Sequence, residues 1–301
     1  MDFFIWLIII IVIAALMRKK GAPGIKSKRG VGLPILSPFH LASLKSLAEI
    51  LNEVAKEMPQ KIQQKPERKA VEDEGALPLP QKASLDKRKK YLQVALNSTI
   101  AEAEMIISQL PHSDRILVEA GTPLIKSYGM RAISQIKANC FSNWSYVVAD
   151  IKTADMAERE VELAARVGAS AATCLGVAPV ETIDYFIESC KKNGIDSIID
   201  MMNVENPILI LRQLKEPPVV VIVHRGVDET ETVKGKPIPY YQINQIKGNC
   251  NTMVAVAGGD TIQEIRSAIF NGADIVVVWK AFYGVQGDVA ELVKEFLKEI
   301  R

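Results

Sequence analysis

The run Val147–Ala157 brings an acid and a base close together in the middle of the chain. Three apolar residues are followed by Asp150, Lys152 and, after a short gap, Asp155. Side chains alternate along a strand, so Asp150 and Lys152 would leave a buried strand on the same face. Burying such charges without partners is costly, and clusters of this kind often form catalytic sites. The run therefore predicts an acid–base pair at a strand end, with a structural ion pair as the alternative.

The elements that would position these residues are short apolar runs, which alternate with amphipathic helical patterns from Tyr91 to the end of the chain. Such alternation predicts a parallel sheet, and eight runs predict a closed (β/α)8 TIM barrel over residues 91–301. An open doubly wound sheet is the competing fold, but no Gly-x-Gly-x-x-Gly turn follows the first strand. The expected strands are Leu92–Leu96, Ile116–Glu119, Tyr146–Asp150, Ala171–Leu175, Ser197–Asp200, Val219–His224, Met253–Ala257 and Asp274–Val278.

The C-terminal ends of nearly all these strands carry polar residues or glycines. Catalytic groups of such barrels lie at those ends. One polar strand end would carry little information, but the repetition predicts a single shared site. The residues are Asn97, Glu119, Asp150 with Lys152, Asp200, His224 with Arg225, Gly258 with Gly259, and Lys280.

Several motifs in this segment occur together in one known superfamily. They are Gln93-Val-Ala-Leu, Glu119-Ala-Gly-Thr-Pro-Leu-Ile-Lys126, Ala149-Asp-Ile-Lys-Thr-Ala-Asp155, Leu175-Gly-Val-Ala, His224-Arg-Gly-Val-Asp228 and Val254-Ala-Val-Ala-Gly-Gly259. The segment Tyr91–Arg301 resembles the orotidine monophosphate decarboxylase superfamily, in the branch of 3-hexulose-6-phosphate synthase and 3-keto-L-gulonate-6-phosphate decarboxylase. Orotidine monophosphate decarboxylase itself fits less well, because the motif that begins at Glu119 belongs to the metal-using branch.

The resemblance implies chemistry through an enediolate with a Mg²⁺ ion. Glu119 and Asp150 match the metal-associated carboxylates, and hard oxygen ligands suit Mg²⁺. Lys152 matches the lysine that neutralises negative charge developing beside the metal. His224 matches a residue placed for proton transfer, which a histidine can perform near neutral pH. Asp155 matches an acid presented to the neighbouring subunit's site, so the resemblance also implies a homodimer.

The resemblance further implies a phosphate-binding end of the site. Gly258 and Gly259 match the loop whose backbone N–H groups meet the substrate phosphate, since glycine permits close approach. The alternative for this pair alone is an ordinary strand-to-helix turn. Asn97, Arg225 and Lys280 are the other residues that we expect to contact the substrate.

Three positions depart from the family pattern. Asn97 stands where the family has an aspartate of the charge network, so the pKa of Lys152 could differ. Met156-Ala157 stands where a glycine usually follows the second aspartate. Trp279-Lys280 replaces a glycine followed by arginine or a small residue. Lys280 can supply charge but not the bidentate fork of arginine, and Trp279 could crowd the pocket.

The predicted function is a Mg²⁺-dependent carbon–carbon lyase acting on a ketose phosphate, similar to 3-hexulose-6-phosphate synthase. That family's reaction joins formaldehyde to ribulose 5-phosphate reversibly. One alternative is the related keto-gulonate phosphate decarboxylase. Another is a non-catalytic, membrane-tethered barrel that binds a sugar phosphate or acts as a scaffold, which Asn97 and Trp279 favour.

The N-terminal segment predicts a membrane anchor. Phe3–Met17 is apolar throughout and Arg18, Lys19 and Lys20 follow it directly. A helix over residues 1–20, with flanking side chains reaching the interface, could cross a bilayer once. The downstream positive charges place the barrel on the cytoplasmic side. A signal peptide or an interfacial helix is the alternative.

The rest of the chain before the barrel is predicted to be a connecting segment. Residues 21–90 are rich in glycine, proline and charge, and they form a linker with an amphipathic helix near 41–58. The 37 basic and 35 acidic residues nearly balance, so charge gives no indication of a nucleic-acid partner. The four cysteines have no paired metal-ligand spacing and are expected to be free thiols.

Overall fold

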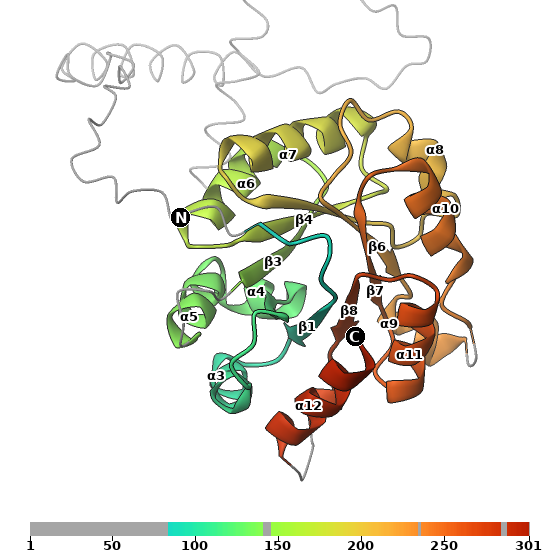
Figure 1. Cartoon of the computed structure of the whole chain (residues 1–301). Helices are drawn as coiled ribbons and strands as arrows, with labels where there is room; N and C mark the ends of the chain where they lie inside the picture. Colours follow the sequence, from blue (N-terminus) through green and yellow to red (C-terminus); the bar gives the residue numbers. More distant parts are fainter. Residues whose placement is uncertain (1–83, 141–145, 234–235, 284–287, 301) are drawn as a thin grey trace, which may run out of the picture. The chain divides into compact units, whose positions relative to one another are not determined.

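The computed structural model describes residues 84–140, 146–233, 236–283 and 288–300. The strands pair in parallel in chain order, and the first also pairs with the last, so the sheet is a closed barrel (Figure 1). The predicted TIM barrel and its eight strands are confirmed. The strands are β1 (Tyr91–Leu96), β2 (Ile116–Ala120), β3 (Tyr146–Thr153), β4 (Ala171–Leu175), β5 (Asp196–Asp200), β6 (Val220–His224), β7 (Met253–Ala257) and β8 (Ile275–Val278).

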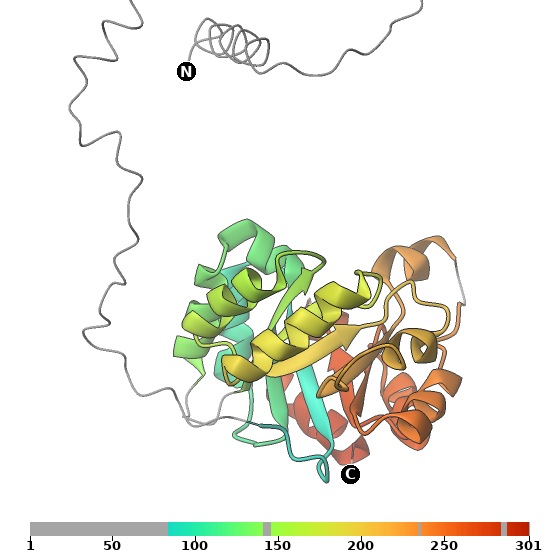
Figure 2. The same cartoon turned by 90° about the horizontal axis from the view of Figure 1, so that it is seen from above.

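The helices surround the strands in the views of Figures 1 and 2. Two of the helices begin at a capping box, in which a threonine pairs with a glutamate three residues later. The threonines are Thr99 and Thr261. The α-helices are α3 (Ile100–Gln109), α4 (Thr122–Tyr128), α5 (Arg131–Asn139), α6 (Ala157–Arg166), α7 (Val180–Lys192), α8 (Pro207–Leu211), α9 (Val227–Thr232), α10 (Tyr241–Asn249), α11 (Ile262–Phe270) and α12 (Val289–Glu299). A short 3₁₀ helix, η2 (Lys280–Phe282), follows β8.

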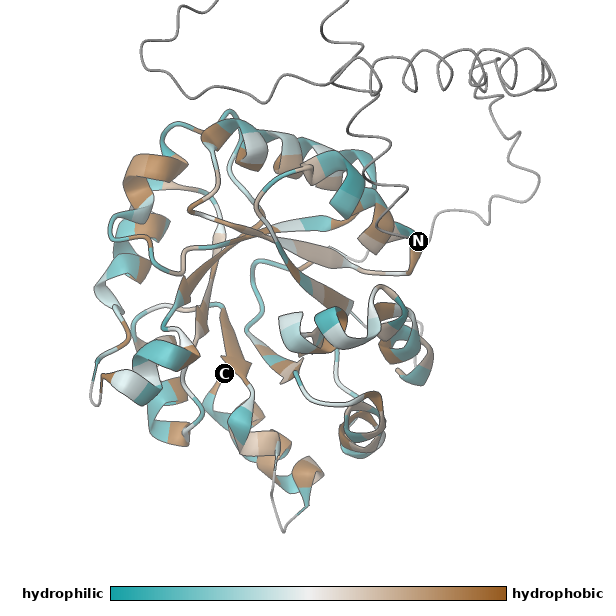
Figure 3. Cartoon of the chain, turned by 180° about the vertical axis from the view of Figure 1, so that it is seen from behind, coloured by the Kyte–Doolittle hydropathy of each residue, from teal (hydrophilic) through white to brown (hydrophobic). Residues whose placement is uncertain are grey.

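Apolar residues fill both sides of the barrel wall. In Figure 3 the strands are mainly hydrophobic and the helices mix polar and apolar residues. One buried cluster joins the strands to the helices, and a second contains strand residues such as Leu117, Val148, Ile198 and Ile222 without helix residues. Side chains alternate along a strand, so this second cluster fills the barrel interior.

The next inward positions along four strands are polar. Two residues beyond each of the four interior residues just named come Glu119, Asp150, Asp200 and His224. The middle of the interior is therefore an apolar floor, and on these four strands a polar side chain follows it at the C-terminal end, as the sequence predicted.

The described part of the chain requires a correction to the predicted membrane location. Among the described residues no helix is long and apolar enough to cross a membrane. The longest of them, α7, has 13 residues, against roughly 20 in a typical span. On this finding we correct the expected single-pass location with the barrel on the cytoplasmic side. The apolar run Phe3–Met17 and the helix expected near 41–58 lie outside the described residues.

Residues 84–90, which the sequence placed at the end of the linker, contact the base of the barrel. Leu85 belongs to the interior cluster, and its N–H donates to Asp196 Oδ2 at 3.3 Å. The ammonium group of Lys90 pairs with Asp274 at 2.9 Å. The packed structure therefore begins before β1.

The contact between α7 and the barrel wall gives a stability prediction. Phe186 is fully buried in the cluster between strands and helices, whereas its neighbour Tyr185 is 65% exposed. Phe186→Ala should lower the free energy of unfolding by about 3–5 kcal/mol, because it removes buried apolar surface and leaves a cavity. Tyr185→Ala, the matched control, should change it by less than about 0.5 kcal/mol. Urea unfolding measures both, and equal losses would contradict this packing.

Candidate active site

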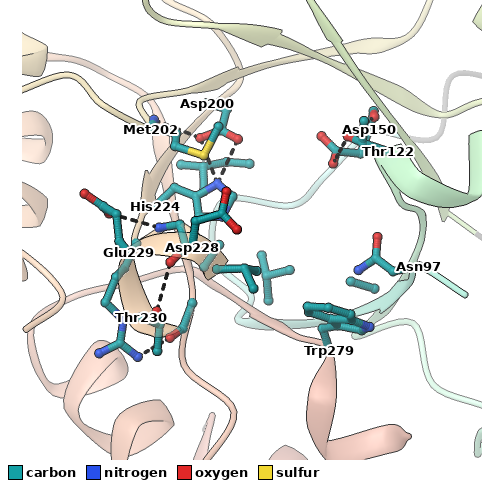
Figure 4. A pocket seen from close by; sticks show the side chains of 18 of the residues that line it. Asn97, Thr122, Asp150, Asp200, Met202, His224, Asp228, Glu229, Thr230 and Trp279 are labelled. Atoms are coloured by element: carbon teal, nitrogen blue, oxygen red, sulfur yellow. Dashed lines mark hydrogen bonds and ion pairs between the residues drawn. The ribbon is translucent and has the colours of Figure 1, made fainter. Parts of the chain in front are cut away.

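The carboxylate of Asp200, at the end of β5, lies at the centre of the polar cluster. Its side chain is 0% exposed. Lys152 Nζ donates to Oδ2 at 2.9 Å, and His224 Nδ1 lies 2.8 Å from the same oxygen. The backbone N–H of Met202 donates to Oδ1 at 3.0 Å. Asp200 therefore links a lysine from β3 and a histidine from β6 through one buried group (Figure 4 shows its bonds to His224).

A bulge in β3 brings Lys152 into this cluster. The strand continues past its predicted end at Asp150, and its register with β4 shifts between Ala149 and Thr153. Lys152 adopts φ 48°, a conformation that non-glycine residues rarely take. Its N–H donates to Thr173 Oγ1 at 2.9 Å rather than continuing the regular ladder. Bulges of this kind redirect side chains next to active sites.

Asp150 lies beside Lys152, as the sequence predicted, although the bulge and not regular strand alternation sets the position of Lys152. Lys152 Nζ donates to Asp150 Oδ1 at 3.1 Å. Thr173 donates to the same oxygen at 2.8 Å, and Thr122 donates to Oδ2 at 2.7 Å. These bonds fix the orientation of the Asp150 carboxylate in the pocket.

Glu119, on β2, is a second buried carboxylate close to Asp150. Burial, together with the negative charge of Asp150, raises the pKa of Glu119 to about 7. The side-chain amide of Gln93 donates to it and opposes this shift. Two carboxylates that repel one another on neighbouring strands suit a divalent cation, which would relieve the repulsion. Mg²⁺ usually takes one or two carboxylates and leaves positions for substrate oxygens, so the residues present fit such an ion.

Each charged group of the cluster shifts the pKa of its partners toward their charged forms. Burial alone would lower the pKa values of Lys152 and His224, but the neighbouring aspartates outweigh it and raise both pKa values. Burial would raise the pKa of Asp200, but His224 and Lys152 hold it well below its ordinary value. These shifts favour the ammonium form of Lys152, the carboxylate form of Asp200 and the protonated form of His224.

These side chains open into a pocket of about 770 Å³ at the C-terminal end of the barrel (Figure 4). It brings together most of the residues that the sequence predicted, whose roles stay predictions: Asn97, Glu119, Asp150, Lys152, His224, Arg225, Gly258 and Lys280. Gly259 is buried just behind the lining, against Glu264 and Ile238. Asp155 is exposed beyond it, where its carboxylate accepts the N–H of Met156 at 2.8 Å.

The predicted phosphate-binding residues have partners within the chain. Arg225 Nη2 donates to Gly258 O and to Glu264 Oε1, the latter at 2.9 Å. Gly258 has φ +96°, and a Cβ there would lie 2.3 Å from the carbonyl oxygen of Arg225, so the turn requires glycine. Lys280 Nζ pairs with Glu231 at 3.0 Å and lies 5.4 Å from the centroid of the Trp279 ring.

Sequence reasoning gave no catalytic or binding role to three residues of the cluster. Asp200 was recognised only as one polar strand end among several, although its position carried the signal. Thr122 lies inside the motif that begins at Glu119, and Thr173 lies on an inward position of β4. Nothing in their local sequence links them to Asp150, because the contact depends on the barrel.

The sequence and fold match proteins of known families. The orotidine 5'-phosphate decarboxylase / HUMPS family matches residues 90–295. A bifunctional enzyme Fae/Hps from Methanocella arvoryzae is 37% identical over 213 residues, which are 70% of this chain and 53% of that protein. The corresponding protein of Methanothrix thermoacetophila is 38% identical, with the same coverage. This chain thus spans about half the length of the curated relatives it matches.

Solved structures with the same fold superpose on the barrel. The 3-hexulose-6-phosphate synthase of Salmonella typhimurium superposes with a TM-score of 0.63 at 29% identity, over 70% of this chain and 98% of the other. The 3-keto-L-gulonate-6-phosphate decarboxylase of Vibrio cholerae superposes with a TM-score of 0.57 at 20% identity, over 70% and 98%. At that identity the second likeness supports the fold alone.

The contact between Asp200 and His224 gives a titration prediction. The raised pKa of His224 means that protonation of this histidine stabilises the fold. That contribution is complete below the ordinary value of 6.5 and is lost as the pH rises through the raised value. Asp200→Asn should lower the pKa of His224, measured by NMR of its ring resonances. Asp228→Asn, which removes an acid elsewhere in the pocket lining, should leave it nearly unchanged; similar shifts in both variants would refute the specific pair.

Proposed function

Because the chain belongs to the orotidine 5'-phosphate decarboxylase / HUMPS family, in the branch of 3-hexulose-6-phosphate synthase and 3-keto-L-gulonate-6-phosphate decarboxylase, we propose that its barrel is a carbon–carbon lyase for a sugar phosphate. One observation carries the proposal. Asp200 holds Lys152 and His224 at 2.9 and 2.8 Å beside the buried carboxylates of Glu119 and Asp150, in a pocket large enough for a sugar phosphate.

The finer proposal is an aldol reaction like that of 3-hexulose-6-phosphate synthase. In the condensing direction, the neutral imidazole of His224 would take a proton from the carbon next to the ketone of ribulose 5-phosphate, and an enediolate would form. That carbon attacks formaldehyde, and the aldehyde oxygen then takes up a proton. The ammonium of Lys152 would stabilise the negative charge of the enediolate. The resulting imidazolium of His224, which Asp200 stabilises, would return that proton to the alkoxide formed from the aldehyde.

Mg²⁺ is part of this proposal, held by Glu119 and Asp150. When bound, the ion would supply positive charge that favours the enediolate over the ketone. Thr122 and Thr173 would orient the Asp150 carboxylate through their bonds of 2.7 and 2.8 Å. The sequence-based expectation of a homodimer is kept here as well. The exposed carboxylate of Asp155 would then reach the pocket of a second copy.

A related decarboxylation is the second candidate. Loss of CO₂ from a keto-gulonate phosphate also leaves an enediolate, so Lys152 would have the same task. A non-catalytic barrel that binds a sugar phosphate is the third candidate, because Asn97 and Trp279 differ from the family pattern. Assaying both reactions separates the three.

Activity of the full chain tests the proposal. With Mg²⁺, the protein should consume formaldehyde and ribulose 5-phosphate together and form a hexulose phosphate. Chelation of the metal should abolish the reaction, and added Mg²⁺ should restore it. Consumption of the keto-gulonate phosphate alone would favour the decarboxylase. If the chain binds the sugar phosphate but converts neither substrate, the lyase proposal is wrong.

Replacement of Lys152 tests its role separately. Lys152→Met should lower kcat/KM by a factor on the order of 10²–10³, because a charge that stabilises the enediolate is lost. Lys192→Met is the matched control, since that lysine pairs with Glu158 on the outer surface of the barrel. It should leave the rate unchanged. A melting curve of each variant excludes unfolding as the cause, and an undiminished rate in Lys152→Met would remove this lysine from the mechanism.

A further inference from the structure

A carboxylate of the chain itself lies in the loops after β7 and β8. Asp260 directly follows Gly258 and Gly259, and it lines the pocket. Its Oδ1 accepts the backbone N–H of Trp279 at 2.7 Å and that of Lys280 at 2.8 Å. One carboxylate oxygen thus holds two neighbouring N–H groups that follow β8.

Asp260 competes with an anionic ligand for these N–H groups. In (β/α)8 barrels, phosphate groups often bind between the loops after the seventh and eighth strands. Adjacent backbone N–H groups are the donors that such anions use. In this chain the donors after β8 already have an anionic partner, which is Asp260. A phosphate that approached them would have to displace it.

The cations around Asp260 are paired as well. Arg225 donates to Glu264 at 2.9 Å, and Lys280 pairs with Glu231 at 3.0 Å. Among the described residues, the buried Nε of Arg225 is a donor without a hydrogen-bond partner. This end of the pocket therefore has donors for an anion, but carboxylates of the chain satisfy most of them.

We propose that Asp260 is a specificity-determining residue that occupies the position of the substrate's phosphate group. The inference rests on the proposed function, since it concerns the phosphate end of the same site. A phosphate-bearing ligand binds only when the Asp260 side chain rotates away from the N–H groups of Trp279 and Lys280. The displacement weakens the binding of phosphate esters, while the binding of an unphosphorylated sugar is unaffected.

Calorimetric titration of the full chain tests this proposal. The probes are ribulose 5-phosphate, inorganic phosphate and unphosphorylated ribulose, each with Mg²⁺ present. Asp260→Ala should bind both phosphate-bearing probes about tenfold more tightly or better, equivalent to about 1.4 kcal/mol. Asp260→Asn should give a smaller gain, because its amide oxygen can still accept the two N–H groups but carries no charge. Ribulose should bind the wild type and both variants equally.

Asp228→Asn is the matched control, because it also removes one negative charge from the pocket lining but lies outside this contact. A gain in phosphate affinity in the Asp260 variants that clearly exceeds the gain in Asp228→Asn supports the proposal. Equal gains would show that the effect comes from the loss of any negative charge in the pocket lining, and they would overturn the proposal. If Asp260→Ala fails to fold, Asp260→Asn carries the same comparison.

The result also separates this inference from the proposed function. If the wild type binds and converts ribulose 5-phosphate, but the Asp260 variants bind phosphate no better, Asp260 only caps the turn and the inference alone fails. If neither the wild type nor a folded Asp260 variant binds ribulose 5-phosphate, both proposals fail.

Discussion

Asp200 is buried at the end of β5, where two basic side chains approach its carboxylate from different strands. A buried carboxylate without partners is strongly disfavoured, and so is a buried ammonium. Asp200 therefore favours the charged forms of Lys152 and His224 inside the barrel, and these two residues favour its carboxylate form. Removing one member of such a set leaves an unpaired buried charge, which typically costs about 3–5 kcal/mol. The geometry of the polar centre thus follows from one shared carboxylate.

The apolar floor beneath this centre makes the arrangement possible. Residues such as Leu117 and Ile198 fill the interior below, so the polar side chains above them are largely buried and line the pocket. In such surroundings, electrostatic interactions are stronger than in water. The same conditions raise the pKa of Glu119 to about 7, through its burial and the charge of Asp150. The Glu119–Asp150 pair and the Lys152–Asp200–His224 set thus place acidic and basic groups close together in the pocket. Such an arrangement suits a reaction in which negative charge develops and is then neutralised.

The sequence predicted the barrel because its signal is repeated: eight apolar runs alternate with helical patterns. It predicted the pairing of Asp150 with Lys152 because the two residues are only two positions apart, so their contact is local. The role of Asp200 could not be predicted, since this residue is 48 positions from Lys152 and meets it only across the closed sheet. The bulge in β3 left no signal either, because a lysine rather than a glycine adopts the left-handed conformation. Asp260 was missed for the same reason as Asp200: its partners follow another strand, 19 residues away.

In the proposed mechanism, the charge network around Asp200 favours the formation of an enediolate from a ketose phosphate. The most direct test is hydrogen exchange without any second substrate. Ribulose 5-phosphate is incubated with the full chain and Mg²⁺ in D₂O, and the signals of the carbon next to the ketone are followed by NMR. The wild type should replace one hydrogen at that carbon by deuterium, and Asp200→Asn should do so far more slowly. Tight binding of ribulose 5-phosphate by the wild type with no exchange would contradict the proposed mechanism.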